Sequence, residues 1–198
     1  MWDDSASRKF YDSELRTRVG RPAGEERDGQ IGWFIGACRD RQLFSVIEVG
    51  AGGGRDGLLL QRARLTYTGV DLSEVGVMLC REQGLNASVA SATRLPFDED
   101  TFDAGWSMST MMHLPGDEIT GALEEFRRVL RPGGLLALGL WGSNPPITRI
   151  DEDERLFQQR TDEQVRSLLK AIGQVIDFKT WGWADNGSHY QWAAIELA

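Results

Sequence analysis

The sequence predicts an α/β fold in which a mostly parallel sheet is covered by helices on both faces. Two patterns support this: short apolar, β-branched runs alternate with amphipathic stretches, and a glycine-rich segment directly follows the first of these runs. The length of 198 residues, with 41% hydrophobic and 26% charged residues, fits one globular domain with one sizeable core. We therefore expect residues 1–42 to form a helical cap within the same domain as residues 43–198.

Seven segments have the composition of strands. The first five are separated by helical stretches, which favours parallel pairing; they are residues 43–49, 65–70, 86–90, 102–106 and 135–140. Two further runs, residues 174–181 and 189–197, are joined by the turn-rich segment 184–187, which predicts an antiparallel hairpin. The expected sheet therefore ends in an antiparallel strand.

Helical periodicity is clearest in the second half of the chain. Apolar residues recur at helical spacing before the segment 131–134, Arg-Pro-Gly-Gly, ends the helix; they are Ile119, Leu123, Phe126 and Leu130. Another helix is predicted from Thr161, an N-cap with Gln164 as its capping-box partner, to Gly173. Further helices are expected around residues 8–18 and 31–41, and one beginning near Leu58.

Charge and cysteine content exclude several classes of partner. Lys and Arg number 22 against 30 Asp and Glu, a net charge of −8, which disfavours a nucleic-acid partner. The polar, acidic start of the chain lacks the pattern of a signal peptide, and no apolar run approaches a membrane span, so we expect a cytoplasmic protein without a membrane partner. Cys38 and Cys80 stand apart from histidines and from each other, which predicts reduced thiols and no metal site.

The glycine-rich segment 50–57 follows the first predicted strand and precedes a helix. Glycines at this point let a ligand touch the backbone. The next strand ends in Asp71, 21 residues after Gly50 and 19 after Gly52, where a carboxylate can accept hydrogen bonds from ribose hydroxyls. The alternative is a tight turn with a capping aspartate. No Gly-Lys-Ser/Thr follows, which excludes a phosphate-binding loop, so the pattern predicts a ribose-bearing cofactor.

Five ordered motifs give residues 46–140 a resemblance to the class I S-adenosylmethionine-dependent methyltransferases, small-molecule branch. They are Glu48-x-Gly50-x-Gly52-x-Gly54; Gly69-Val70-Asp71-Leu72-Ser73; Leu95-Pro96-Phe97 followed by Phe102-Asp103; and the run from Arg128 to Gly134. The resemblance implies a Rossmann-like, doubly wound fold, S-adenosyl-L-methionine as cofactor and a small molecule as methyl acceptor.

The resemblance also implies which residues contact the cofactor. Backbone groups of Gly50, Ala51 and Gly52 would line its methionine portion and Glu48 would orient the loop; Asp71 would hold the ribose and Leu72 the adenine face. Ala92 and Thr93 would border the adenine, Trp106 and Ser107 would face the methyl group, and Tyr11 with the helical cap would close over the site. Ser91 departs from the family, which commonly has an acidic residue there to accept the adenine amine; a hydroxyl accepts more weakly.

His113 lies seven residues beyond Trp106, where a loop would pass the mouth of the site. An imidazole there could act as a catalytic general base or could anchor the loop. Apolar side chains could form a substrate wall or pack in the core; they are Met108, Met111, Met112, Trp141, Trp33 and Phe34.

Other motifs have less specific interpretations. Gly52-x-Gly54-x-x-Gly57 also fits a dinucleotide fingerprint, but Asp71 then comes only 14 residues after the last glycine, and a Tyr-x-x-x-Lys pair is lacking. Segment 144–147, Asn-Pro-Pro-Ile, has neither the position nor the composition of the similar motif in methyltransferases that act on amino nitrogens. It therefore indicates a stiff loop. The acidic segment 151–154 is expected to be a solvated turn leading into a helix.

The sequence therefore predicts methyl transfer to oxygen or nitrogen of a small, largely apolar or aromatic metabolite. Two alternatives remain: a protein of the same fold that binds the cofactor without transferring a methyl group, and an NAD-dependent oxidoreductase.

Overall fold

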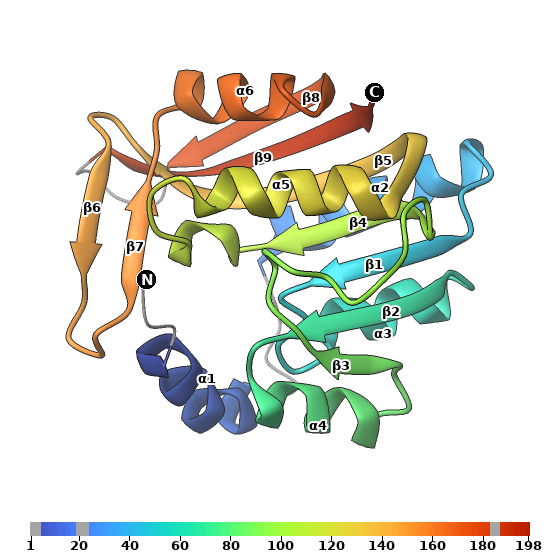
Figure 1. The fold of residues 1–198 in the computed structure, drawn as a ribbon, viewed down its shortest axis with the longest axis horizontal. Coiled ribbons are helices and arrows are strands. Elements are labelled where there is room, and N and C mark those ends of the chain that lie inside the picture. The colour runs from blue at the N-terminus through green and yellow to red at the C-terminus, as the bar shows by residue number, and fades with distance from the viewer. Residues whose placement is uncertain (1–4, 19–23, 183–186) are drawn as a thin grey trace.

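The computed structural model describes residues 5–18, 24–182 and 187–198 and shows an α/β sandwich built on a twisted sheet (Figure 1). Within these residues the sheet has seven strands: β1 (Ser45–Val49), β2 (Thr66–Asp71), β3 (Ala87–Val89), β4 (Phe102–Met108), β5 (Leu130–Ser143), β8 (Gly173–Gly182) and β9 (Ser188–Leu197). Their order is β3-β2-β1-β4-β5-β9-β8, and β9 alone runs opposite to the other six strands. The Rossmann-like, mostly parallel sheet with an antiparallel last strand is confirmed.

Helices cover both faces of this sheet. They are α1 (Ser5–Arg18), α2 (Glu25–Asp40), α3 (Arg55–Arg62), α4 (Glu74–Glu82), the short 3₁₀ helix η1 (Met111–His113), α5 (Glu118–Val129) and α6 (Asp162–Lys170). Apolar residues of α2, α3 and α4 form one buried cluster with the sheet, and those of α5 and α6 form another on the opposite face. Helix α1 stands apart from both layers, beside α4 at the edge where the parallel strands end (Figure 1).

Central strand β1 shows why the parallel strands lack polar alternation. Its residues from Val46 to Val49 are buried, because helices cover both faces. The thiols of Cys38 and Cys80 are free and buried, and burial raises the pKa of each to about 12. The predicted capping box of α6 is also present, with Gln164 N donating to Thr161 Oγ1 at 3.3 Å.

A second sheet was not predicted. Residues 147–159 form the hairpin of β6 (Ile147–Ile150) and β7 (Leu156–Gln159), so the helix expected after segment 151–154 is wrong. The turn is built around Asp151, whose carboxylate accepts from the amide of Arg155 at 2.9 Å and from its guanidinium Nε at 2.9 Å. Strands of four residues are too short to show a period, which explains the error.

Two further predictions concern the turn between the last two strands and membrane-spanning helices. Most of the predicted turn at 184–187 lies outside the described residues, although the antiparallel pairing of β8 and β9 is confirmed. In the part of the chain that is described, no helix is long and apolar enough to span a bilayer.

Candidate functional site

A cavity of about 510 Å³ lies where β1, β2 and β4 end. The carboxyl edge of an open parallel sheet is where such folds bind ligands. Three elements from elsewhere in the chain complete its wall: α1 contributes Tyr11 and Leu15, η1 contributes Met112 and His113, and β7 contributes Phe157. Figure 1 shows α1 and the β6–β7 hairpin at the same end of the sheet. The cavity therefore brings together the ends of the strands, the helical cap and the hairpin.

The glycine loop forms the floor of this cavity through Gly50 and Gly52, whose φ angles are +85° and +51°. A side chain at residue 50 would place its Cβ 1.9 Å from the Thr110 hydroxyl oxygen. The amides of Gly50 and Ala51 already donate to the carbonyl of Val70, at 2.8 and 3.1 Å. Because these amides are already bonded, Gly50 and Gly52 suit a ligand chiefly through the close backbone approach that glycine allows.

Asp71 ends β2 and lies in the cavity wall. Its Oδ2 accepts from the amide of Gly52 at 2.7 Å, and its Oδ1 accepts from the amide of Ser73 at 2.8 Å. Burial raises the pKa of Asp71, and these two amide bonds oppose that rise. The carboxylate is thus fixed between the glycine loop and the start of α4, with its oxygens at the cavity.

The predicted cofactor-binding residues divide into two groups. Six line the cavity: Tyr11, Gly50, Gly52, Asp71, Leu72 and Ala92. The other six lie outside its lining: Glu48, Ala51, Ser91, Thr93, Trp106 and Ser107. The Trp106 indole nitrogen donates to Asp56 at 2.8 Å, the Ser107 hydroxyl donates to the carbonyl of Val49 at 2.7 Å, and the Ser91 and Thr93 hydroxyls bond to each other at 2.9 Å.

Glu48 sits in the interior behind the glycine loop. It accepts a hydrogen bond of 2.6 Å from the Tyr67 hydroxyl, which connects β1 to β2. Burial raises the pKa of Glu48 well above its ordinary value, and the neighbouring Asp56 adds to the rise, against Tyr67 and Arg27. Burial thus favours the neutral form of Glu48, and its hydrogen bond to Tyr67 holds the strand from which the loop departs.

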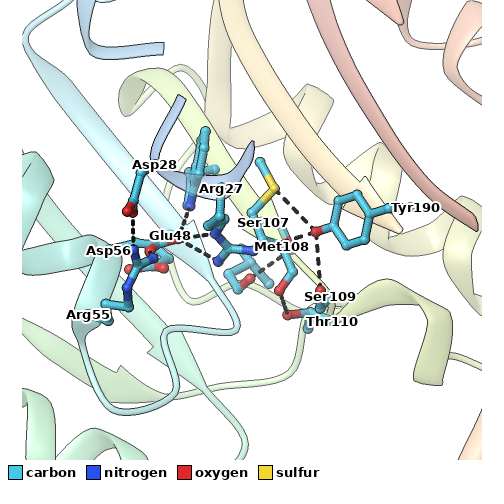
Figure 2. A network of polar contacts seen from close by, with 12 residues as sticks. Arg27, Asp28, Glu48, Arg55, Asp56, Ser107, Met108, Ser109, Thr110 and Tyr190 are labelled. Carbon is cyan, nitrogen blue, oxygen red and sulfur yellow. Dashed lines mark hydrogen bonds and ion pairs between the residues drawn. The ribbon is translucent and has the colours of Figure 1, made fainter. Parts of the chain in front are cut away.

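A buried polar network behind the cavity was missed from the sequence (Figure 2). Arg27 from α2 donates through Nε to Asp56 at 2.9 Å, and its Nη1 lies 3.5 Å from the hydroxyl of Tyr190 on β9. Tyr190 in turn bonds the hydroxyl of Ser109 at 3.1 Å. Ser109 has a φ of +56° and lines the cavity, so the network fixes the backbone where β4 turns into η1. The available signal was Asp56, a charged residue two positions after Gly54.

His113 is held by hydrogen bonds at both ring nitrogens. Nδ1 lies 2.7 Å from the carbonyl oxygen of Leu156, and Nε2 lies 2.9 Å from the hydroxyl of Tyr11. A carbonyl oxygen only accepts, so Nδ1 carries the proton and, in the neutral ring, Nε2 accepts from Tyr11. Burial lowers the pKa of His113, as do Arg155 and Arg149, whereas Leu156 and Asp151 oppose the shift. The ring is therefore neutral at pH 7.

Aromatic side chains form the outer wall beside His113. Phe157 stacks on Trp141 with ring centroids 5.3 Å apart and meets the His113 ring edge-on at 4.6 Å. Arg155 lies 3.6 Å over the ring of Phe10, which joins the hairpin to α1. The sequence could not place Phe157 or Arg155 because the hairpin was not predicted.

The apolar residues considered for a substrate wall also divide into those that line the cavity and those that do not. Met108, Met112 and Trp141 line the cavity. Phe34 packs against Trp106 at 4.9 Å in the core under α2, and Met111 is buried in the core under α5. Trp33 is 36% exposed and packs against Trp192 at 5.0 Å, so all three lie outside the cavity lining.

Comparisons with known proteins agree with this geometry. Residues 47–138 match the family model described as a methyltransferase domain. The chain is 25% identical over 185 residues to 27-O-demethylrifamycin SV methyltransferase of Amycolatopsis mediterranei, covering 89% of this chain and 62% of that protein. It is 34% identical over 143 residues to a probable phthiotriol/phenolphthiotriol dimycocerosates methyltransferase of Mycobacterium ulcerans, covering 68% and 54%. The chain thus spans less than two thirds of these relatives.

Among solved structures, the fold resembles that of the Burkholderia thailandensis 1,6-didemethyltoxoflavin-N1-methyltransferase. The TM-score is 0.67 at 22% identity, over 99% of this chain and 80% of that one. The reversed last strand, the glycine loop and the aspartate that ends β2 form an α/β arrangement suited to a nucleoside cofactor. Together with the match of residues 47–138 to the methyltransferase-domain model, this arrangement is consistent with a class I S-adenosylmethionine-dependent methyltransferase.

Proposed function

We propose that this chain binds S-adenosylmethionine in the cavity and transfers its methyl group to oxygen or nitrogen of a small, largely apolar or aromatic molecule. The observation that carries the proposal is that Asp71, the glycine loop and an aromatic wall share one cavity. Bound there, the cofactor supplies an electrophilic methyl group on a sulfonium.

The residues present fit this cofactor. The side-chain-free floor at Gly50 and Gly52 suits close contact with the methionine portion, and the Asp71 oxygens suit a ribose diol. Leu72 and Ala92 offer apolar contacts for the adenine. Ser91, which bonds Thr93, leaves the adenine amine without the acidic partner common in the family.

The acceptor would occupy the part of the cavity between η1 and the aromatic wall. Methyl transfer is an in-line displacement, so alignment in a dry site can supply most of the acceleration. Trp141, Phe157 and Met112 exclude water and favour a planar or apolar acceptor. By their names, two of the similar proteins methylate 27-O-demethylrifamycin SV and 1,6-didemethyltoxoflavin, and the net charge of −8 favours an uncharged small molecule over nucleic acid.

We propose that His113 provides general-base catalysis at this end of the cavity. Its ring is neutral, lines the cavity and is fixed in one tautomer by Leu156. A base at this point takes the proton that an oxygen or nitrogen acceptor loses on methylation.

The test is transfer of labelled methyl from S-adenosylmethionine to a panel of small phenols, amines and apolar hydroxy compounds, with bulk tRNA as a macromolecular arm. We expect label in one or more of the small aromatic acceptors and none in tRNA. Label in tRNA alone would contradict the proposed acceptor class. Cofactor binding with no transfer to any member of the panel would favour the alternative of a binding protein on the same fold.

A further inference from the structure

Tyr11 stands between the cavity and the proposed base. Its hydroxyl lies 2.9 Å from Nε2 of His113, and the side chain itself lines the cavity. Because Nδ1 donates to the carbonyl of Leu156, Nε2 is the nitrogen able to accept a proton, and Tyr11 already bonds it. Direct proton abstraction by His113 would first have to break this hydrogen bond.

We propose that Tyr11 is a catalytic residue that contacts the methyl acceptor and relays its proton to His113. The inference rests on the proposed methyl-transfer function and assigns a chemical step to a helix that would otherwise only cover the cofactor. His113 then acts through Tyr11, and the carbonyl of Leu156 fixes the orientation of its ring.

The step balances without any further reactant. The acceptor oxygen or nitrogen forms a bond to the methyl carbon, the bond from that carbon to sulfur breaks, and its electron pair stays on sulfur. The acceptor proton passes to the phenol oxygen of Tyr11 while the Tyr11 proton passes to Nε2 of His113. The products are the methylated acceptor, S-adenosylhomocysteine and an imidazolium that returns its proton to solvent.

The surroundings of His113 suit a transient proton acceptor. Arg155 and Arg149 from the hairpin disfavour its charged form, Asp151 favours it, and the Leu156 carbonyl accepts from Nδ1–H in both forms. Tyr11 on α1 and Phe157 on β7 pack against the ring edge-on, with centroids 5.7 and 4.6 Å away. The ring is therefore neutral at rest and held for transfer through Nε2.

The hydrogen-bond geometry can be tested without an acceptor, by nitrogen-15 NMR of the histidine side chains in the full chain. The sequence has two histidines, so His189→Asn assigns both and serves as the control. We expect the Nδ1–H tautomer for His113, and a shift of its Nε2 resonance in Tyr11→Phe with the tautomer retained. An Nε2–H tautomer, or an Nε2 resonance unaffected by Tyr11→Phe, would overturn the relay.

The proton step is tested with two acceptors of similar shape, 4-methylphenol and 4-nitrophenol, at saturating cofactor and a mildly alkaline pH where only the nitrophenol is ionised. We expect Tyr11→Phe to slow methylation of 4-methylphenol by about 10²–10⁴-fold and to leave 4-nitrophenol, which has no proton to give, little changed. The wild-type rate with 4-methylphenol should fall as the pH drops and His113 becomes protonated, and His113→Gln should remove that dependence.

Three results would contradict the relay in distinguishable ways. Equal slowing of both phenols by Tyr11→Phe would make Tyr11 a positioning residue, and no slowing of either would remove it from the reaction; in both cases wild-type turnover upholds the proposed function. If the wild-type protein binds the cofactor but methylates neither phenol nor any other member of the acceptor panel, the relay and the proposed acceptor class fail together.

Discussion

Glu48 shows how one residue of the family motif can act through the fold instead of through the ligand. It lies outside the cavity lining, is buried, and bonds Tyr67 across β1 and β2. A sequence motif records that a residue is required but does not distinguish a ligand contact from a support beneath it. Whether a residue of β1 contacts the ligand or supports the loop depends on which face of the strand its side chain occupies.

We expect Glu48→Gln to stabilise the protein increasingly as the pH rises. The pKa of Glu48 in the folded state lies well above the ordinary value of 4.5. Below pH 4.5 the carboxyl group is neutral in both the folded and the unfolded chain, so folding costs little. Above pH 4.5 the unfolded chain loses this proton while the folded chain keeps it, so the wild-type protein loses stability as the pH rises towards the folded-state pKa. Within that window the difference in unfolding free energy should grow by about 1.4 kcal/mol per pH unit. Urea unfolding of both proteins across the pH range measures it; a difference independent of pH would mean that Glu48 has the same pKa folded and unfolded.

At Gly50, both the backbone conformation and a close neighbour disfavour a side chain. Its positive φ disfavours any side chain, and a Cβ there would meet Thr110. Gly84 offers a matched control, since its φ is +79° but a Cβ would meet nothing within 4 Å.

Gly50→Ala should therefore unfold at lower temperature than Gly84→Ala, and the extra loss measures the clash with Thr110. We expect about 1–2 kcal/mol from φ strain in both variants and a further loss only at residue 50. Thermal unfolding of the two variants, with S-adenosylhomocysteine binding measured beside it, makes the comparison. Equal losses would show that Thr110 moves aside freely.

At the scale of elements, the long periodic segments were predictable and the short ones were not. Helices α5 and α6 carry clear apolar stripes and end signals, and β1 is a β-branched run in which Glu48 is the one charged residue, so local sequence determines them. The β6–β7 hairpin has four-residue strands whose pairing depends on the turn at Asp151, and the link from Arg27 to Tyr190 joins residues 163 positions apart. Neither leaves a local pattern, so Phe157 and Tyr190 could not be assigned to the site from sequence.

Helix α1 is attached to the site by contacts at both of its sides. Asp12 bonds the hydroxyl of Ser73 at the start of α4, and Phe10 packs under Arg155 of the hairpin. A helix held in this way should retain the cofactor by covering it.

We expect a chain lacking residues 1–20 to bind S-adenosylhomocysteine more weakly, because Tyr11 and Leu15 no longer close the cavity. Loss of about 1–3 kcal/mol, measured by calorimetry, matches the burial of one or two apolar side chains. Circular dichroism of the truncated chain checks that the sheet remains. An undiminished affinity would remove α1 from the cofactor site.

At the scale of the whole molecule, we propose that residues 1–42 and 43–198 form one domain. Helix α2 belongs to the same buried cluster as α3 and the sheet, through Ile31, Phe34 and Cys38. Limited proteolysis should cut within residues 1–42 and leave one stable remainder. A second protected fragment of comparable size, detected by mass spectrometry, would contradict a single domain.

We expect the cavity over Gly50, Gly52 and Asp71 to bind S-adenosylmethionine. Calorimetric titration of the full chain with S-adenosylhomocysteine, and separately with NAD, tests it most directly. We expect saturable binding of S-adenosylhomocysteine, weakened by about 2 kcal/mol in Asp71→Ala through loss of a charged acceptor, and no binding of NAD. Saturable NAD binding without a response to S-adenosylhomocysteine would contradict the claim and support a dinucleotide-dependent enzyme instead.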